Sequence, residues 1–366
     1  MSNTMKAVVV TARGKTELKD VPVPSPSAGE ILVQTRAIAV NPTDYNELLF
    51  LTFLRAGHSV LTLFPSRDFL APEGSWLGCD YMGVVSKLGE GVTNVKEGDR
   101  VAGFVHGGAW EGEGWAEYIK AQASLVWKVP DNLSDEEGAA AAGVGPWTVI
   151  QAFYFRLKLA TPANPTKEAE PVLIWGGSTS TGLYGIQFLK ASGYTPIVTA
   201  SEKNFDKLKQ LGAAACYSYS DPDVASKIAK DYPKLRYALD TISEGKTTVT
   251  AVKAISQAAG KGKVITLLTN KDEELKQFAD SVPAEPTLLY TVLGVEFEWP
   301  GVKFPASPED KAAMEGWMPL LPDLFKSGTI KPNPILPFDG GLANITEGLD
   351  YVKSGKQSAQ KVVYKV

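Results

Sequence analysis

One short segment, residues 172–182, constrains the fold of this 366-residue chain more than any other. It begins with the continuous apolar run Val172-Leu173-Ile174-Trp175, passes through a pair of glycines, and ends at Gly182. From Thr181 to Ala191, apolar residues then recur at helical spacing. A buried strand that leads through a glycine-rich turn directly into a helix is typical of a βαβ unit with a parallel sheet.

The glycine-rich turn itself predicts a phosphate-binding site. Gly-x-Gly-x-x-Gly between a strand and a helix is the dinucleotide-binding pattern, and here Thr179 stands at its middle glycine. We expect Gly177 to permit the tight turn, Gly182 to allow close packing of helix on strand, and the helix N-terminus to face a pyrophosphate. Hydroxyl donors would come from Ser178, Thr179, Ser180 and Thr181. The alternative is a plain βα loop in which Ser178 or Thr179 caps the helix.

The rest of the chain divides into two parts with different predicted secondary structure. After residue 171, strands and helices alternate, which indicates a doubly wound parallel sheet. Predicted strands there are Ile197–Thr199, Arg236–Asp240 and Lys263–Leu268, and a second helix is predicted over Phe205–Leu211. Before it, β-like runs separated by proline and glycine suggest a small barrel or sandwich, with strands at Lys6–Thr11, Glu30–Val40 and Arg100–Phe104.

The residues after the second strand of the sheet predict which cofactor binds. An NAD site would place Asp or Glu at the end of this strand, to hold the ribose 2′-hydroxyl. Here Ser201 can bond a 2′-phosphate and Lys203 can neutralise it, whereas Glu202 is expected to point elsewhere. We therefore expect NADPH rather than NADH. The alternative for Lys203 is an ordinary solvated charge at a helix start.

Cysteine and histidine are scarce, which excludes several kinds of site. The whole supply is His58, Cys79, His106 and Cys216. A four-Cys zinc lobe and a disulfide scaffold cannot be built from it, and no metal is expected. Two lone thiols fit a reducing interior, and the N-terminus lacks the pattern of a secretory signal, so a cytoplasmic location is expected.

Charge and hydropathy exclude two further classes of partner. A net charge of −4 and a pI near 5.5 argue against a nucleic-acid partner, which needs a basic face. The longest uncharged run, 138–155, is broken by glycine and proline and is only moderately apolar, which favours a buried segment over a membrane helix.

With these motifs in place, the chain resembles the zinc-free medium-chain dehydrogenases/reductases, near quinone oxidoreductases and the stand-alone (trans-acting) enoyl reductases of fungal polyketide pathways. The resemblance covers nearly the whole chain. Besides the glycine-rich turn, the matching stretches are Asn41-Pro42-Thr43-Asp44, Gly78-Cys79-Asp80-Tyr81-Met82-Gly83, 89–104, 192–197, 236–240 and 355–363.

The resemblance implies an α/β fold with two domains. A GroES-like β-barrel catalytic domain would span 1–147 and be completed by 318–366. An inserted Rossmann NADPH-binding domain, with its doubly wound parallel sheet, would span 148–317. The active site would lie in the cleft between the two domains.

The resemblance also accounts for the missing metal ligands. Zinc-dependent relatives carry a ligand where this chain has Asn41, and another where it has Cys79. Without zinc, alcohol oxidation lacks its Lewis acid, whereas reduction of an activated C=C bond needs mainly positioning and hydrogen-bond donors for the enolate. The implied function is NADPH-dependent reduction of an α,β-unsaturated carbonyl compound (enone, enal or enoyl thioester) by hydride transfer to the β-carbon. The alternatives are quinone reduction and a non-catalytic NADPH-binding role.

Site residues carried over from the family complete the expectation. Tyr45 is the first candidate for enolate stabilisation or proton donation, with packing as its alternative, and Thr148 is expected at the carboxamide or substrate carbonyl. Many fungal relatives have Lys at the position of Asn46, so a Lys-based acid is absent here. Leu293 and Gly294 should line the substrate. Residues expected to bind the cofactor are Thr43, Asp44, Asn46, Gly177, Ser178, Thr179, Ser180, Thr181, Gly182, Ser201, Lys203, Asn204, Tyr219, Leu267, Leu268, Gln357 and Ser358.

Two expectations concern partners. The segment 48–76 is long and apolar for a loop over an active site, and it predicts either a hydrophobic lid for a bulky acyl substrate or an extra packed helix or dimer contact. The partner expected in every case is a small enone or acyl substrate, with no nucleic acid and no membrane. A homodimer and a polyketide synthase partner are possible additions implied by the family.

Overall fold

The computed structural model describes residues 3–12, 14–49, 71–109, 112–299 and 302–366. Residues 50–70, which form most of the proposed lid, lie outside this description together with His58. The chain forms two compact units. Unit 1 comprises Met1–Val144, Tyr290–Lys326 and Pro332–Val366, and unit 2 comprises Gly145–Leu289 and Ser327–Lys331.

Unit 1 is built mainly from antiparallel β structure. Its largest sheet has the order β16-β17-β3-β4-β5-β7, with β6 also paired to β3, and two further pairs are β1-β2 and β14-β15. The strands are β1 (Thr4–Ala12), β2 (Lys15–Pro22), β3 (Glu30–Ala39), β4 (Asp80–Leu88), β5 (Arg100–Phe104), β6 (Tyr118–Gln122), β7 (Val126–Lys128), β14 (Phe297–Trp299), β15 (Val302–Phe304), β16 (Ile335–Phe338) and β17 (Lys361–Lys365). The helices are α1 (Pro42–Leu49), η2 (Ala123–Leu125), α2 (Asp135–Ala140), α8 (Pro308–Glu315), α9 (Leu321–Lys326), η7 (Gly341–Asn344) and α10 (Ile345–Lys353).

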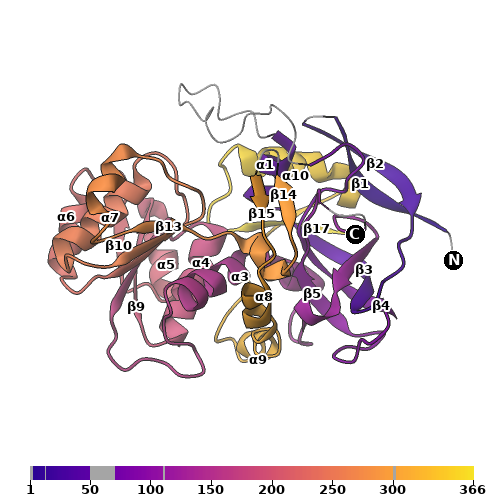
Figure 1. Cartoon of the computed structure of the whole chain (residues 1–366), viewed down its shortest axis with the longest axis horizontal. Coiled ribbons are helices and arrows are strands. Elements are labelled where there is room, and N and C mark those ends of the chain that lie inside the picture. Colours follow the sequence, from indigo (N-terminus) through magenta and orange to yellow (C-terminus); the bar gives the residue numbers. More distant parts are fainter. Residues whose placement is uncertain (1–2, 13, 50–70, 110–111, 300–301) are drawn as a thin grey trace. The chain divides into compact units, whose positions relative to one another are not determined.

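The C-terminal strand completes the N-terminal sheet. Strand β17 pairs antiparallel with β3, with Val363 opposite Ala39, so the last strand of the chain joins a sheet whose other central strands come from the first 130 residues (Figure 1). One core cluster of this unit joins side chains from β1, β3 and β17 with Trp115 and with helix α10. The C-terminal strand therefore belongs to the largest sheet of unit 1.

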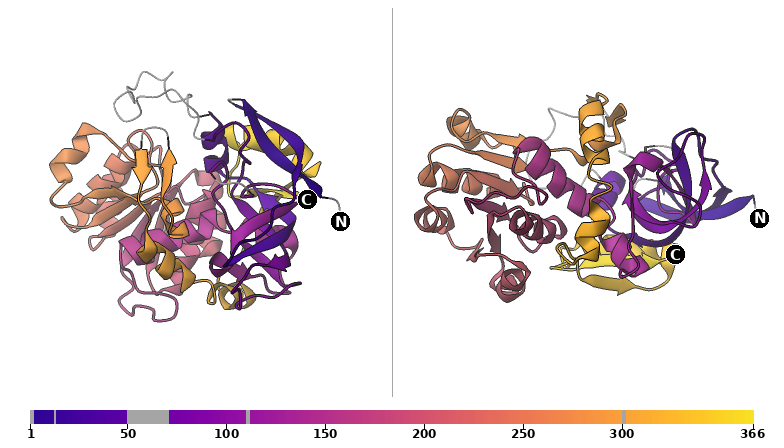
Figure 2. Two further views of the ribbon diagram at one scale, coloured as in Figure 1. Left: turned by 45° about the vertical axis from the view of Figure 1, so that its right-hand side comes forward. Right: turned by 90° about the horizontal axis from the view of Figure 1, so that it is seen from below.

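Unit 2 holds a six-stranded parallel sheet in the order β10-β9-β8-β11-β12-β13. Figure 2 shows helices on both faces of this sheet, as in a doubly wound fold. The strands are β8 (Pro171–Trp175), β9 (Thr195–Ala200), β10 (Ala215–Ser218), β11 (Tyr237–Asp240), β12 (Lys263–Thr266) and β13 (Ala284–Pro286). The helices are α3 (Val144–Ile150), the π-helical η3 (Gln151–Arg156), α4 (Ser180–Ala191), η4 (Glu202–Asn204), α5 (Phe205–Leu211), α6 (Val224–Asp231), α7 (Thr247–Ala258) and η5 (Glu273–Phe278). Helix η6 (Leu289–Leu293) starts at the last residue of this segment and otherwise belongs to unit 1. The α/β fold class with an inserted Rossmann sheet is confirmed.

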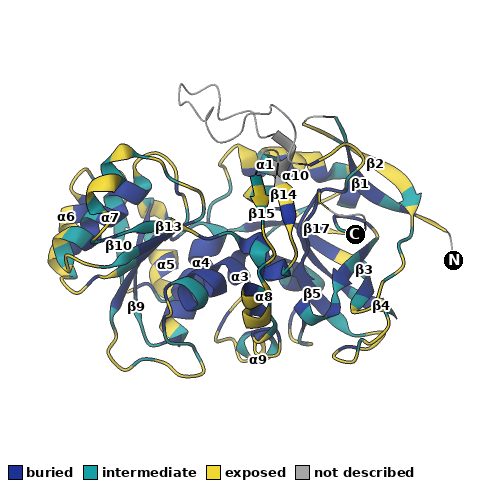
Figure 3. Ribbon diagram, viewed as in Figure 1, coloured by how far each residue is buried: buried dark blue, intermediate teal, exposed yellow. Residues whose placement is uncertain are grey.

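Burial follows the sequence pattern. The apolar runs of β8 and β9 are buried, whereas β2, which carries several charges, is largely exposed and mostly yellow in Figure 3. The uncharged run 138–155 forms the end of α2, helix α3 and most of η3, and it is largely buried, as expected. Within the described ranges, no helix combines the length and the apolar character needed to cross a membrane.

The compact units divide the chain differently from the predicted domains at three places, of which 290–317 is the longest; residues 145–147 and 327–331 lie in unit 2 and not in the first domain. Residues 290–317, which the sequence reasoning assigned to the Rossmann domain, belong to unit 1. This stretch contains the β14-β15 hairpin and helix α8, neither of which joins the parallel sheet. The domain boundaries themselves stay a prediction.

Candidate functional site

The glycine-rich turn follows β8, the strand next to β11 where the order of the parallel sheet reverses. This is the place where ligands bind in open parallel sheets. The left-handed residue of the turn is Gly176, with φ +87°, and not Gly177, which was expected to supply the tight turn. The backbone therefore turns one residue earlier than the pattern indicated.

Gly177 and Gly182 are required by close contacts. A Cβ on Gly177 would lie 2.7 Å from Cβ of Val198 on β9, and one on Gly182 would lie 2.3 Å from the carbonyl oxygen of Gly176. Neither space admits a side chain. Gly182 thus lets the first turn of α4 pack directly on the turn, as predicted, and keeps the helix N-terminus beside it.

Thr179 caps helix α4. Its Oγ1 accepts a hydrogen bond from the Gly182 amide at 2.9 Å and lies 3.0 Å from the carbonyl oxygen of Gly176. It also lies 2.9 Å from Oγ1 of Thr241, which follows β11. This hydroxyl is engaged within the turn, so the capping alternative holds for Thr179. Ser178, Ser180 and Thr181 stay predicted phosphate ligands of this turn.

The next two strands bring a second set of predicted residues together. Oγ of Ser201, after β9, and the phenolic oxygen of Tyr219, after β10, lie 3.1 Å apart. Tyr219 is 54% exposed, which is high for a large aromatic side chain. Lys203 is exposed in η4, and Asn204 beside it is buried. The adjacent strand ends thus carry a hydroxyl pair and an exposed ammonium group.

The ends of β11 and β12 are held by side-chain hydrogen bonds. Asp240 accepts from the amides of Ile242 and Ser243, each at 3.0 Å. The amide of Leu267 donates to Oγ of Ser243 at 2.8 Å, and Oγ1 of Thr266 donates to the Leu268 carbonyl at 2.8 Å. Asp240 therefore has the structural role expected of it, and Leu268 is left exposed at this strand end.

Helix α1 carries three of the predicted site residues, Thr43, Tyr45 and Asn46, and their surroundings differ from one to the next. Tyr45 is half-buried and packs against the core cluster around Trp115, which favours its packing alternative. Oγ1 of Thr43 is buried and finds no hydrogen-bond partner among the described residues, so it remains a candidate ligand donor. Asn46 is half-buried.

Three other predicted site residues lie in helix α3 and in the loop before β17. Thr148 is buried in helix α3. Gln357 and Ser358 lie in the loop before β17, where Nε2 of Gln357 donates to the Gln360 carbonyl at 2.6 Å. Their functional roles stay predictions.

A buried polar cluster in unit 1 contains the two residues that stand at zinc-ligand positions of the family. Nδ2 of Asn41 donates to Oδ2 of Asp80 at 2.9 Å, and Lys361 donates to Oδ1 of Asn41. The Lys361 ammonium lies 3.3 Å from the Asp80 carboxylate, whose other oxygen accepts from the Val144 amide at 2.7 Å. Sequence reasoning missed Lys361 and Asp80, since no local pattern links residues so far apart in the chain.

Asp44 is the second carboxyl group of this cluster. It is fully buried, and its Oδ2 accepts from the Asn41 amide at 2.6 Å. Burial raises the pKa of Asp44 to about 7 and Asp80 adds to the rise, while the Asn41 amide, Lys361 and a hydrogen bond from Cys79 oppose it. At neutral pH this carboxyl group is therefore partly protonated.

Cys79 also contacts a tyrosine that the sequence reasoning did not consider. Sγ of Cys79 and the phenolic oxygen of Tyr290 lie 3.9 Å apart, and both side chains are buried. The centroid of the Tyr290 ring lies 4.1 Å from that of the His106 ring and 5.3 Å from that of the Phe104 ring. Burial lowers the pKa of His106 to about 3, so this imidazole is neutral.

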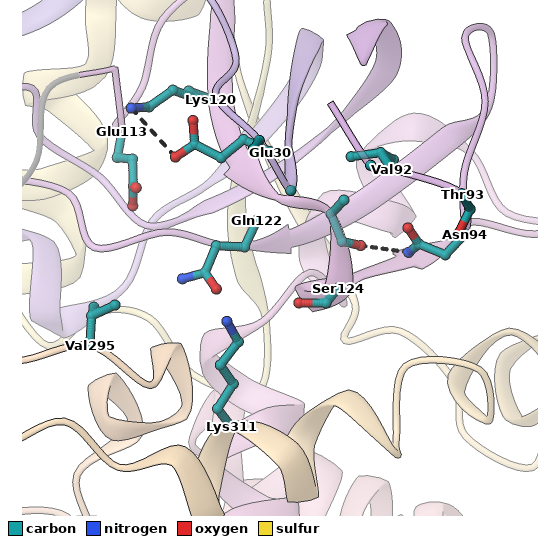
Figure 4. A pocket seen from close by; sticks show the side chains of 14 residues that line it. Glu30, Val92, Thr93, Asn94, Glu113, Lys120, Gln122, Ser124, Val295 and Lys311 are labelled. Atoms are coloured by element: carbon teal, nitrogen blue, oxygen red, sulfur yellow. Dashed lines mark hydrogen bonds and ion pairs between the residues drawn. The ribbon is translucent and has the colours of Figure 1, made fainter. Parts of the chain in front are cut away.

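A pocket of about 720 Å³ opens beside the predicted substrate loop of unit 1 (Figure 4). Nε2 of Gln122, in its lining, donates to the carbonyl of Leu293 at 3.1 Å. Figure 4 shows the Lys311 ammonium directed toward Gln122, and Lys120 forms an ion pair with Glu30 at 3.5 Å. The lining is formed by Ala28, Gly29, Glu30, Gly91, Val92, Thr93, Asn94, Glu113, Lys120, Gln122, Ala123, Ser124, Val295 and Lys311.

Among the described residues, no group of three or more His, Cys, Asp or Glu side chains is placed to hold a metal ion. The cluster around Asn41 instead contains one side-chain amide, one thiol, the carboxyl group of Asp44 and the carboxylate of Asp80, which is ion-paired with Lys361.

Two family models match this chain. "Alcohol dehydrogenase GroES-like domain" matches residues 27–131, and "Zinc-binding dehydrogenase" matches residues 180–302. The first match lies in unit 1. The second covers most of the parallel sheet, from helix α4 onward.

Relatives and solved structures agree over the full length. Trans-enoyl reductase ACTTS2 of Alternaria alternata is 36% identical over 99% of both chains. Trans-enoyl reductase resD of Aspergillus sclerotiorum is 33% identical over 99% of this chain and 100% of that one. Among solved structures, the match to the CurK enoyl reductase has a TM-score of 0.74 at 19% sequence identity and covers 100% of this chain and 99% of that one. The match to a quinone oxidoreductase of Pseudomonas syringae pv. Tomato DC3000 has a TM-score of 0.73 at 21% sequence identity and covers 99% of this chain and 100% of that one. At these identities the two structures show the shared fold alone.

Proposed function

The chain belongs to the trans-enoyl reductase family of the medium-chain dehydrogenases/reductases, and on that basis we propose that it reduces the C=C bond of an α,β-unsaturated carbonyl compound with NADPH. The similarity to named trans-enoyl reductases over 99% of the chain carries this proposal. The implied substrates are enones, enals and enoyl thioesters.

The residues of unit 2 fit a nicotinamide dinucleotide. The contacts of Gly177 and Gly182 leave no room for side chains, so the turn and the N-terminus of α4 present backbone amides at the switch point of the sheet. Gly177, Ser178, Ser180 and Thr181 would hold the pyrophosphate. Leu267 and Leu268, at the end of β12, would lie against the nicotinamide.

The choice of NADPH over NADH rests on the strand ends that follow β9 and β10. Ser201, Tyr219 and Lys203 would bind the 2′-phosphate through two hydroxyls and one ammonium group. At the end of β9 this chain has Ser201, whereas an NAD site would have Asp or Glu there to hold the ribose hydroxyl.

The chemistry requires little acid or base from the protein. When bound, NADPH supplies a hydride from C4 of its nicotinamide to the β-carbon of the substrate. Negative charge then develops on the carbonyl oxygen, and the protein must present hydrogen-bond donors there and keep the substrate oriented. Tyr45 and Thr148 remain candidates for this work, and Leu293 and Gly294 for holding the substrate.

One screen tests the function against its alternatives. NADPH oxidation is followed with enals, enones, quinones and an enoyl thioester, and NADPH binding is followed in parallel by fluorescence. We expect turnover of the enoyl thioester or enone to exceed that of quinones. Turnover of quinones alone would establish the quinone reductase alternative, and tight NADPH binding without any turnover would establish the non-catalytic one.

Four further expectations stay predictions. The first is a cytoplasmic location, which rests on cysteine usage. The others are a homodimer and a polyketide synthase partner that delivers the acyl chain, both implied by the family. The lid role of 48–76 also stays a prediction, since most of that segment lies outside the described residues.

A further inference from the structure

A pocket in unit 1 has the size of a small-molecule binding site and no assigned ligand. Its volume is about 720 Å³, and every described residue that lines it belongs to unit 1 (Figure 4). Ligand pockets in proteins usually have volumes of about 300–1,000 Å³. None of the predicted cofactor, catalytic or substrate residues is among the described lining residues. The proposed reductase function therefore leaves this pocket unexplained.

Two half-buried lysines line the pocket, and each has only a loose partner. Nζ of Lys120 lies 3.5 Å from Oε1 of Glu30, and Nζ of Lys311 lies 3.9 Å from Oε1 of Glu315. A charge-assisted hydrogen bond between an ammonium group and a carboxylate is about 2.7–2.9 Å long. Glu315 is not a lining residue, and Figure 4 shows the Lys311 ammonium group directed into the pocket, toward Gln122. Both ammonium groups can therefore take a better acceptor from a ligand.

The carboxyl groups of the lining oppose a negatively charged ligand only in part. Glu30 is balanced by Lys120. Burial raises the pKa of Glu113 to about 7 and Glu30 adds to the rise, while the His106 amide and Lys120 oppose it. At neutral pH the carboxyl group of Glu113 is therefore partly protonated. The positive charge of Lys311 is then only partly compensated within the described lining, so the pocket favours an anionic group.

Neutral groups of the lining can bind hydroxyl groups of a ligand. Nδ2 of Asn94 donates to the Ala123 carbonyl at 2.6 Å, and Nε2 of Gln122 donates to the Leu293 carbonyl at 3.1 Å. Because the nitrogens make these bonds, the side-chain oxygens of Asn94 and Gln122 remain acceptors for hydroxyl donors. The hydroxyl of Ser124, which also lines the pocket, can both donate and accept. A ligand that carries hydroxyl groups beside its negative charge fits this set.

The walls of the pocket are held in place without a ligand. The side-chain bond of Asn94 ties the loop after β4 to η2, and that of Gln122 ties β6 to η6. The stem of Lys311 packs on Gly294, where a Cβ would lie 2.5 Å from Cδ of the lysine. A site that is formed in advance spends little binding energy on ordering its own groups.

We propose that this pocket binds a small hydroxylated carboxylate, whose carboxylate contacts Lys311 and whose hydroxyl groups bond Gln122 and Ser124. Lys120 adds to the positive potential of the site. The single charge of Lys311 matches a carboxylate better than a doubly charged phosphate. The inference goes beyond the proposed function, because this ligand is neither the cofactor nor the enone and is not chemically changed.

Three six-carbon probes test the class of ligand. Gluconate carries a carboxylate and hydroxyl groups, sorbitol carries hydroxyl groups only, and hexanoate carries a carboxylate only. Isothermal titration calorimetry measures their dissociation constants at low salt, since salt screens the lysines. We expect gluconate to bind about tenfold more tightly than either of the others, because only gluconate uses both kinds of contact. No gluconate binding, or sorbitol or hexanoate binding as tightly as gluconate, would overturn the proposal.

Lys311→Met tests the assigned carboxylate contact. Removing the ammonium group should weaken gluconate binding about tenfold, the worth of one charge-assisted hydrogen bond. Lys303→Met is the matched control, because Lys303 is an exposed lysine of the same unit, on β15, and is not a lining residue. This control should bind gluconate like the wild-type protein. Equal gluconate affinities in the two variants would refute the assigned contact and with it the proposal.

Ser124→Ala provides a second variant if Lys311→Met folds poorly. Losing this hydroxyl should weaken gluconate binding about fivefold and leave hexanoate binding unchanged. An unchanged gluconate affinity in Ser124→Ala would count against hydroxyl recognition and overturn the proposal.

A competition experiment separates this pocket from the predicted cofactor site. NADPH should leave the dissociation constant of gluconate unchanged, because no predicted cofactor residue is among the described lining residues. Displacement of gluconate by NADPH would assign the probe to the cofactor site and overturn the proposal. None of these measurements requires turnover, so their failure would leave the proposed reductase function intact.

Discussion

The carboxylate of Asp80 and the ammonium group of Lys361 lie 3.3 Å apart, with 1% of each side chain exposed. Asp80 begins β4 and Lys361 begins β17, so the ion pair joins the middle of the N-terminal sheet to the last strand of the chain. Asn41 bridges the two charges. A buried pair of this kind leaves a costly lone charge if either member is removed.

Lys361→Met is therefore expected to destabilise the protein by about 3–5 kcal/mol, because Asp80 loses its compensating charge in a buried place. Urea unfolding measures the change. Lys365→Met is the control on the same strand: Lys365 is exposed and pairs with Glu136, so little change is expected. The double variant Asp80→Asn/Lys361→Met should recover part of the loss. A Lys361→Met protein as stable as Lys365→Met would contradict the account.

Asp44 should make stability fall as the pH rises. Its folded pKa is about 7 against an ordinary 3.8, so the folded state binds the proton more tightly than the unfolded chain. Its stabilising effect is complete below about pH 4 and is lost as the pH rises through about 7. Unfolding free energies at pH 5 and pH 8 should therefore differ less in Asp44→Asn than in the wild-type protein. Asp131→Asn, at an exposed loop carboxylate, is the control and should keep the wild-type difference.

Lys203→Ala should weaken NADPH binding about tenfold, the worth of one charge-assisted hydrogen bond, and leave NADH binding unchanged. The physical reason is that the two cofactors differ only in the 2′-phosphate. Dissociation constants for both come from fluorescence titration. Lys207→Ala, which removes another exposed lysine from the following helix α5, should change neither constant. Equal losses of both cofactors in Lys203→Ala would refute the assigned 2′-phosphate contact.

Thr179 stands at the middle glycine position of the turn and caps α4, so removing its hydroxyl should lower the free energy of unfolding. Thr179→Ala is expected to cost about 1 kcal/mol, because the Gly182 amide loses its acceptor. Thr179→Ser keeps the hydroxyl and should cost less. Thermal unfolding of the two variants checks the order, and an Ala variant at least as stable as the Ser variant would show that the cap contributes nothing.

Locally determined elements were predictable. The helix expected over Thr181–Ala191 is α4, Ser180–Ala191, and the strand expected over Arg100–Phe104 is β5 with the same bounds. Each depends on hydrophobic periodicity and on flanking turn residues, which neighbouring positions supply. The turn was less predictable in detail, because whether Gly176 or Gly177 takes the positive φ depends on how closely β9 approaches.

The sequence by itself determined the parallel sheet with its glycine-rich turn, the absence of a four-Cys zinc lobe, and the hydroxyl and ammonium groups after β9. These follow from residue type, order and spacing. Only the tertiary structure decided that Lys361 forms an ion pair with Asp80, that the Thr179 hydroxyl caps helix α4, and that the Tyr290 hydroxyl contacts the Cys79 sulfur. Residues 79 and 290 are far apart in the chain, and their contact exists because packing, rather than any local pattern, brings helix η6 against the residue that precedes strand β4.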